Sequence, residues 1–130
     1  MKSALLILAC LLVAGCATIS GPKVLTDFDS GHEITVAVGE IFDVELPSNI
    51  TTGYGWNYRS ECEPVVEQVG KRAYVPRSAS FGMVGVGGTE IWRFRATKSG
   101  RQSLQLDYAR SWEKGAAPAR TVIFNVVVKV

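Results

Sequence analysis

The segment that decides the fold class is EITVAVGEIFDVEL, from Glu33 to Leu46, in a chain of 130 residues. Apolar side chains stand at every second position before and after Gly39-Glu40, a pair that is typical of a tight turn. Alternation with a period of two lets one face of a strand pack on a core while the other face meets solvent. The segment therefore predicts two β-strands joined by a short turn.

The same alternation recurs along the rest of the chain. The last segment has β-branched residues on both faces, so we expect it to be covered on both sides. About seven such segments, with turns at intervals of roughly 8 to 12 residues, are typical of an all-β, immunoglobulin-like β-sandwich of antiparallel strands. The further strands are expected at residues 54–58, 91–96, 104–108 and 121–130, with a weaker region at 65–75.

The N-terminus has the character of an export signal. Lys2 gives a positive start, and the apolar run of residues 4–13 is too short to cross a bilayer as a helix. The run ends in small residues before Cys16, which resembles a bacterial lipobox, in which the cysteine is lipidated and becomes the new N-terminus. We therefore expect a lipoprotein signal peptide at 1–15, a lipidated Cys16 with a tether at 16–30, and one domain at 31–130.

The residue after Cys16 bears on location. It is Ala17 rather than Asp, which implies, by resemblance to other such lipoproteins, the outer membrane of a Gram-negative cell. The domain would then lie in the periplasm, attached to the membrane through lipid. An ordinary secretory signal cleaved elsewhere, with Cys16 incidental, is the alternative.

Charge and composition exclude several classes of protein. The formal net charge is +2, without the basic excess that a nucleic-acid binder needs to displace counterions. After Cys16, the histidine and cysteine content is only His32 and Cys62, too few for a zinc site, so we expect no metal and no cofactor. With no partner for a disulfide, Cys62 is expected to be a small buried residue.

Three connections are longer than the turns between the other strands, at residues 47–53, 77–88 and 110–120. If each strand reverses direction, all three fall at the same end of the sandwich. Long loops on a rigid scaffold commonly carry binding, so the pattern predicts one binding edge built from three loops. Taken singly, each loop also has a structural explanation, such as Trp112 folding back onto the edge of the sandwich.

Together, the three loops resemble those of the chagasin-like inhibitors of papain-family cysteine peptidases. That family carries an Asn-Pro-Thr-Thr-Gly-aromatic loop, a Gly-X-Gly-Gly loop and an Arg-Pro-Trp loop, in this order. They stand here as Asn49 to Tyr54, Gly85 to Gly88, and Arg110-Ser-Trp112. Ile50 and Ser111 replace the two family prolines, which removes a restraint on φ from each loop. The resemblance extends over the body of the chain from about Val36 and implies the same immunoglobulin-like fold.

What the resemblance implies is a reversible, monomeric inhibitor that occludes the active-site cleft without chemistry. Residues 51–53 would lie over the catalytic cysteine of the peptidase, with the glycine loop on one side. Trp112 would pack on the other side, and Arg110 would fix its loop or pair with the enzyme. The residues expected to bind the peptidase are Asn49, Thr51, Thr52, Gly53, Tyr54, Gly85, Gly87, Gly88, Arg110 and Trp112.

Two other functions are compatible with parts of the sequence. An enzyme could use Cys62 with His32, but a nucleophile also needs an orienting partner and an oxyanion site, and the sequence offers neither, so we expect no catalytic residues. A non-inhibitory, envelope-anchored binding or adhesion module shares the fold, since sandwiches host many functions. Such a module has no reason to carry these three motifs at one end.

Overall fold

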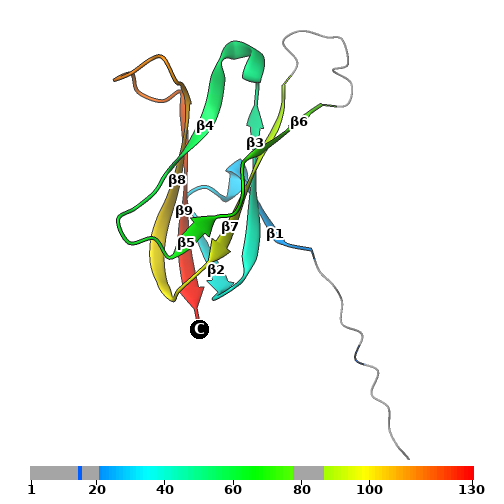
Figure 1. Cartoon of the computed structure of the whole chain (residues 1–130), viewed down its shortest axis with the longest axis vertical. Coiled ribbons are helices and arrows are strands. Elements are labelled where there is room, and N and C mark those ends of the chain that lie inside the picture. Colours follow the sequence, from blue (N-terminus) through cyan, green and yellow to red (C-terminus); the bar gives the residue numbers. More distant parts are fainter. Residues whose placement is uncertain (1–14, 16–20, 78–86) are drawn as a thin grey trace, which may run out of the picture.

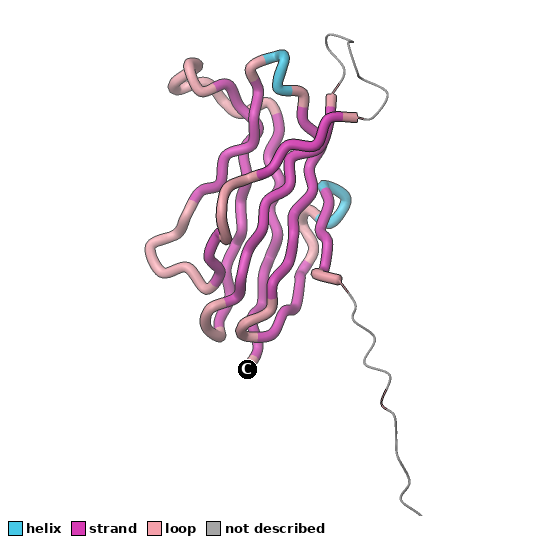
Figure 2. Tube along the Cα trace, turned by 45° about the vertical axis from the view of Figure 1, so that its right-hand side comes forward, coloured by secondary structure: helices cyan, strands magenta, loops and turns pink. Residues whose placement is uncertain are grey.

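The structure, a computed structural model, describes residue 15 and residues 21–77 and 87–130, which form a two-layer β-sandwich (Figure 1; Figure 2). The elements are β1 (Lys23–Thr26), the 3-10 helix η1 (Asp27–Asp29), β2 (Glu33–Ala37), β3 (Ile41–Ser48), the 3-10 helix η2 (Ile50–Thr52), β4 (Tyr54–Arg59), β5 (Val66–Gln68), β6 (Ala73–Pro76), β7 (Gly88–Ala96), β8 (Gly100–Arg110) and β9 (Arg120–Lys129). One sheet has the order β1-β3-β7-β5, with β6 also paired to β7, and the other has the order β2-β9-β8-β4. The predicted β-sandwich is confirmed. The expectation that all strands are antiparallel is wrong for two pairings, β1 with β3 and β2 with β9, which are parallel. Neither pair is joined by a hairpin, because β2 in the other sheet comes between β1 and β3 in the chain, and β2 pairs with the last strand.

The predicted alternation places the core between the two sheets. The inward side chains form one hydrophobic cluster, in which Trp56, Phe94 and Phe124 are fully buried. Across β3 and β7, Phe42 pairs with Phe94, and their rings stack with centroids 5.7 Å apart. Large aromatic side chains remove much apolar area from water, so they give the sandwich a firm body from which loops can project.

The expectation of cover on both faces of the last strand is wrong for most of β9. On its outer face Ile123 is 37% exposed and Asn125 is exposed, whereas Val127 is buried. No further layer of the described structure lies over this face of the sheet (Figure 2). The β-branched residues there pack against neighbours on the same pleated surface, which also favours them in strands.

The predicted boundary between tether and domain at residue 31 is also wrong, because the sandwich begins at Lys23. Residues 23–26 form β1, which pairs with β3 in the register Lys23↔Phe42 to Thr26↔Glu45 and buries Leu25. The following η1 is fixed to β9 by an ion pair of 3.0 Å between Arg120 Nη2 and Asp27 Oδ2. A strand of four residues is too short to show its alternation in sequence.

The expectation that Cys62 is buried is wrong as well. It is a free, exposed thiol in the connection between β4 and β5. This connection passes from one sheet to the other outside the core, and its neighbours Glu61 and Glu63 are also exposed.

For the first and third of the predicted loops, the clustering at one end is confirmed; residues 78–86 of the second lie outside the described residues. The β3–β4 and β8–β9 connections lie at the upper end in Figure 1, as do the facing ends of β6 and β7. β1 starts beside Phe42 and runs parallel to β3 toward these loops, so the chain enters from the other end, where the C-terminus also lies (Figure 1). Within the described residues, no helix is long and apolar enough to cross a membrane.

Candidate functional site

The first loop, residues 49–53, is held in shape by its own hydrogen bonds. Asn49 caps η2, and its Oδ1 accepts from Thr51 N at 3.2 Å and from Thr51 Oγ1 at 2.6 Å. Thr52 Oγ1 donates back to Asn49 O at 2.6 Å. A side-chain oxygen at the N-cap satisfies backbone donors that the short helix leaves open. The two threonines thus serve first to close the loop, and both remain exposed at its tip.

Gly53 ends the loop in a conformation that requires glycine. Its φ is +81°, in the left-handed region, and its N–H donates to Ile50 O at 3.1 Å. A Cβ atom at this position would also overlap the ring of Trp112 at Cη2. Trp112 therefore lies directly against the first loop, while 65% of it remains exposed. The ring both folds back on the edge and presents a large apolar surface.

Arg110 joins the third loop to the first. Its Nε donates to Thr52 O at 3.0 Å, and its Nη1 pairs with Glu113 Oε1 at 3.1 Å. The guanidinium lies over the ring of Tyr54 at 4.4 Å from the centroid, a cation–π contact. Of the two expected roles for Arg110, the structure contains the one in which it fixes the loop.

An aromatic stack supports both loops from below, and two of its three members, Tyr108 and Trp56, lie outside the predicted site. Tyr108, in β8, accepts a hydrogen bond from Asn49 N at 3.0 Å through its hydroxyl. Its ring lies 5.2 Å from that of Tyr54 and 4.9 Å from that of Trp56. Trp56 Nε1 in turn donates to Pro47 O at 3.0 Å, at the end of β3. From the alternation, Tyr108 is predicted to lie in a strand, with no sign that it contacts a loop.

A buried carboxylate was also missed. Glu90, in β7, is 2% exposed, and its Oε2 accepts from Ser48 Oγ at 2.5 Å and from Trp56 N at 3.2 Å. Its Oε1 pairs with Arg72 Nη1 at 3.1 Å. Glu90 occupies an inward register on the same face as Trp92. A charged residue at such a position is a signal that could have drawn attention to it, because a buried charge needs partners.

The second loop is described only at its ends. Gly85 lies outside the described residues, and Gly87 and Gly88 lie beside the first loop and β6. Gly87 O accepts from Arg77 N at 3.2 Å, and a Cβ on Gly87 would come within 3.0 Å of Ser48 O. At Gly88, a Cβ would overlap Val75 O. Both glycines thus allow backbones to approach closely, and a hollow of about 270 Å³ remains between the two loops, with Tyr108 in its lining.

The structure thus brings the predicted binding residues of the first and third loops together. The two described ends of the second loop lie beside them. Cys16, the predicted lipidation site, lies outside the described residues. In the described part of the chain, no group of three or more His, Cys, Asp or Glu side chains could hold a metal.

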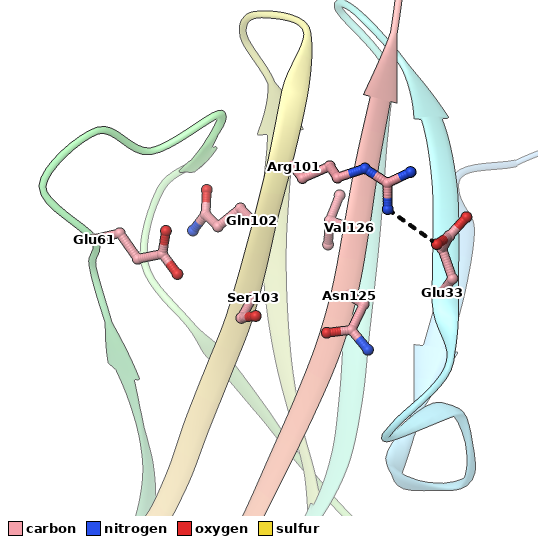
Figure 3. Close-up of a pocket in the computed structure, with 7 residues that line it drawn as sticks. All are labelled: Glu33, Glu61, Arg101, Gln102, Ser103, Asn125 and Val126. Atoms are coloured by element: carbon pink, nitrogen blue, oxygen red, sulfur yellow. Dashed lines mark hydrogen bonds and ion pairs between the residues drawn. The ribbon is translucent and has the colours of Figure 1, made fainter.

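A separate hollow of about 510 Å³ lies on the outer face of the four-stranded sheet, bordered by the β4–β5 connection (Figure 3). The ion pair between Arg101 and Glu33, at 3.3 Å, lies across one side of it. Both of these side chains are largely exposed, and the hollow has no part in the predicted edge.

Comparisons with known proteins agree with this architecture. The profile of the chagasin family peptidase inhibitor I42 matches residues 35–126. Amoebiasin-2 of Entamoeba histolytica is 26% identical over 115 residues, which cover 87% of this chain and 90% of that protein. Chagasin of Trypanosoma cruzi is 31% identical over 91 residues, or 68% of this chain and 81% of chagasin.

A solved structure gives the same result in three dimensions. The crystal structure of the cysteine protease inhibitor EhICP2 from Entamoeba histolytica superposes with a TM-score of 0.70 at 25% identity, covering 82% of this chain and 95% of that one. Because the family profile spans most of the sandwich, the chain belongs to the chagasin family of peptidase inhibitors, I42.

Proposed function

We propose that this protein is a reversible inhibitor of papain-family cysteine peptidases that fills the active-site cleft with the three loops at one end of its sandwich. The observation that carries the proposal is the packing of Trp112 on Gly53, together with the bond from Arg110 to Thr52 O. These contacts join the first and third loops into one edge before any partner is bound. The family is one of peptidase inhibitors, and the similar structure EhICP2 is a cysteine protease inhibitor by name.

The physical mechanism is occlusion by a surface that is already in shape. A self-bonded first loop loses little conformational entropy on docking, and this spares part of the free energy that association otherwise costs. Thr51 and Thr52 are exposed at the tip and would enter the cleft. Trp112, with 65% of its surface free, would be buried beside it and serve as the aromatic anchor.

The protein needs no chemistry of its own for this role. Cys62 is in the β4–β5 connection, whereas the loop edge is formed at the ends of β3, β6 and β8. The family is inhibitory rather than catalytic, and we assign no catalytic residue and no cofactor.

We further propose that Cys16 carries lipid and holds a monomeric inhibitor on the outer membrane, in the periplasm. The seven Cα–Cα steps from Cys16 to Lys23 can span at most about 25 Å. Since β1 enters from the end opposite the loops, an anchor there would leave the binding edge facing away from the membrane. Palmitate labelling of the wild type and of Cys16→Ala tests the anchor, and equal labelling of the two would exclude it.

The inhibition itself is tested by titrating residues 17–130, which contain the whole described sandwich, against papain. The expected result is a loss of turnover that is restored on dilution. A lack of inhibition of every papain-family peptidase tried at micromolar concentration would refute the proposal and favour a non-inhibitory binding module.

A further inference from the structure

The first loop is unusual in its attachment, because it crosses from one sheet to the other. It leaves β3 at Ser48 and continues into β4, where Trp56 is the first fully buried residue. β3 and β4 belong to different sheets, so no ladder of backbone hydrogen bonds joins them in the described structure. The two ends of the loop are therefore linked by the backbone bonds inside the loop and by side chains beneath it.

A single carboxylate oxygen joins these two ends. Glu90 Oε2 accepts from Ser48 Oγ at 2.5 Å and from Trp56 N at 3.2 Å. Hydrogen bonds to an ionised acceptor are stronger than those between neutral groups. Glu90 comes from β7, in the middle of the five-stranded sheet, and is itself held in the strand ladder opposite Leu46.

Arg72 completes the arrangement from the outside. Its Nη1 pairs with Glu90 Oε1 at 3.1 Å and donates to Trp56 O at 2.5 Å. β4 is the edge strand of its sheet, so no neighbouring strand bonds to the outward N–H and C=O of Trp56. Glu90 accepts from this N–H and Arg72 donates to this C=O, so both groups have the partners that a neighbouring strand would give. The pair thus closes the edge of one sheet and ties it to the other, directly beneath the loop.

We propose that Glu90, held by Arg72, is a positioning residue for the inhibitory loop. The inference rests on the proposed function, in which residues 51–53 enter the cleft. Glu90 is 2% exposed and acts through the loop rather than by touching a peptidase. Without it, the bond from Trp56 Nε1 to Pro47 O remains, but Ser48 and Trp56 N lose their shared acceptor. The two ends of the loop are then held less firmly, and part of the binding free energy is spent on restoring the bound shape.

The other end of the sandwich offers a matched control in Gln102. This side chain is 4% exposed, and its Oε1 accepts from Val65 N at 2.8 Å and from Val66 N at 3.2 Å. It too links the two sheets, from β8 to β5, and it borders the outer-face hollow (Figure 3). Gln102 lies near the start of β8, whereas the third loop follows the other end of this strand. Its Nε2 also donates to the Tyr58 hydroxyl at 3.1 Å, in β4, but Gln102 has no bond to Ser48 or Trp56. Loss of Gln102 therefore removes a buried polar clamp of similar size and leaves the bonds at the ends of the first loop in place.

The experiment compares Glu90→Met with Gln102→Met in residues 17–130. Thermal unfolding and the rate of dissociation from papain are measured at a temperature where both variants are folded. Both substitutions lower the melting temperature, but Glu90→Met also raises the dissociation rate about tenfold, equivalent to about 1.4 kcal/mol. Gln102→Met changes that rate by less than about twofold. Equal effects of the two variants on dissociation would overturn the proposal.

Two milder substitutions keep the test decisive if Glu90→Met does not fold. Glu90→Gln preserves shape but replaces one acceptor oxygen by a donor, and Ser48→Ala removes only the bond at 2.5 Å. Each is expected to raise the dissociation rate by roughly threefold to tenfold. Unchanged rates in both variants count against the positioning role.

Amide hydrogen exchange of the free protein separates this inference from the proposed function. In Glu90→Gln, exchange at Trp56 N–H and Gly53 N–H becomes faster, whereas in Gln102→Met it stays as in the wild type. If the wild type inhibits no papain-family peptidase tried, the proposed function fails, and faster exchange still supports Glu90 as the residue that holds the loop. Unchanged exchange in Glu90→Gln refutes the positioning role whatever the inhibition.

Discussion

The first and third loops of the binding edge are built in opposite ways. Residues 49–53 are closed by hydrogen bonds among themselves, and Tyr108 and Glu90 hold the loop from below. All of residues 111–119 are exposed, and contacts near the two ends of this loop fix it, at Glu113 and at Ala119. The third loop takes its position from the first, through Trp112 on Gly53 and Arg110 on Thr52 O. Changes in the first loop should therefore alter both loops, whereas changes in the third should alter one.

Gly53→Ala tests this dependence most severely. The substitution places a Cβ where φ is +81° and where the ring of Trp112 lies, so both loops must move. We expect the inhibition constant for papain to rise at least about a hundredfold, equivalent to about 2.7 kcal/mol. Gly115→Ala is the control, because its φ is +83° but a Cβ there meets nothing within 4 Å. Equal losses in the two variants would mean that the contact with Trp112 does not matter.

Trp112→Ala removes the anchor and leaves the first loop intact. With 65% of Trp112 exposed in the free protein, its loss should hardly change the thermal stability. The dissociation rate should rise by about thirtyfold, as expected for a hot-spot contribution of about 2 kcal/mol. Phe28→Ala, at an 87% exposed residue of η1, is the control and should leave the rate unchanged. An unaltered rate for Trp112→Ala would place this side chain outside the interface.

Arg110→Lys weakens the link between the loops without removing the charge. A lysine cannot bind Thr52 O and Glu113 together in the fork geometry of a guanidinium. We expect about a fivefold rise in the dissociation rate. Arg101→Lys, at an exposed ion pair on the outer face, supplies the comparison. If the two variants dissociate alike, the third loop does not depend on Arg110.

Ile50→Pro should strengthen inhibition instead of weakening it, and its effect should be the smallest of the four. Ile50 is the first residue of η2, where proline is favoured, and Asn49 before it is already extended, with φ −128° and ψ 96°. The ring would restrict the free loop to its present shape, and a gain of up to about 1 kcal/mol is typical of a compatible site. The inhibition constant should fall by roughly twofold to fivefold. A weaker inhibitor would show that the bound loop differs from the free one.

The sequence was informative wherever a pattern extended over many residues. The alternation of Phe42 with Val44 and of Trp92 with Phe94 predicted strands, and strand parity placed the three loops at one end. The pattern of alternation did not reveal β1, whose four residues form a strand through pairing with β3. It also led to the wrong expectation that the outer face of β9 is covered.

The contacts that support the loops could not be predicted in the same way. Glu90, Arg72 and Ser48 meet from three separate segments, and only the folded register brings them together. The motifs identified the tips of the loops, since residue type matters there. The supporting residues depend on distance in space, which a local pattern does not contain.

The direction of β1 has a mechanical consequence. It runs parallel to β3, from Lys23 beside Phe42 toward the end of the sandwich that carries the loops. Lys23 Nζ donates a hydrogen bond to Thr35 O at 2.8 Å. A peptidase held at the loops and an anchor attached ahead of Lys23 would pull on the protein along the strands. Interstrand hydrogen bonds lie roughly across that direction, so they would share the load in shear instead of opening one by one. A tethered inhibitor of this topology should resist being unravelled while its target is pulled away.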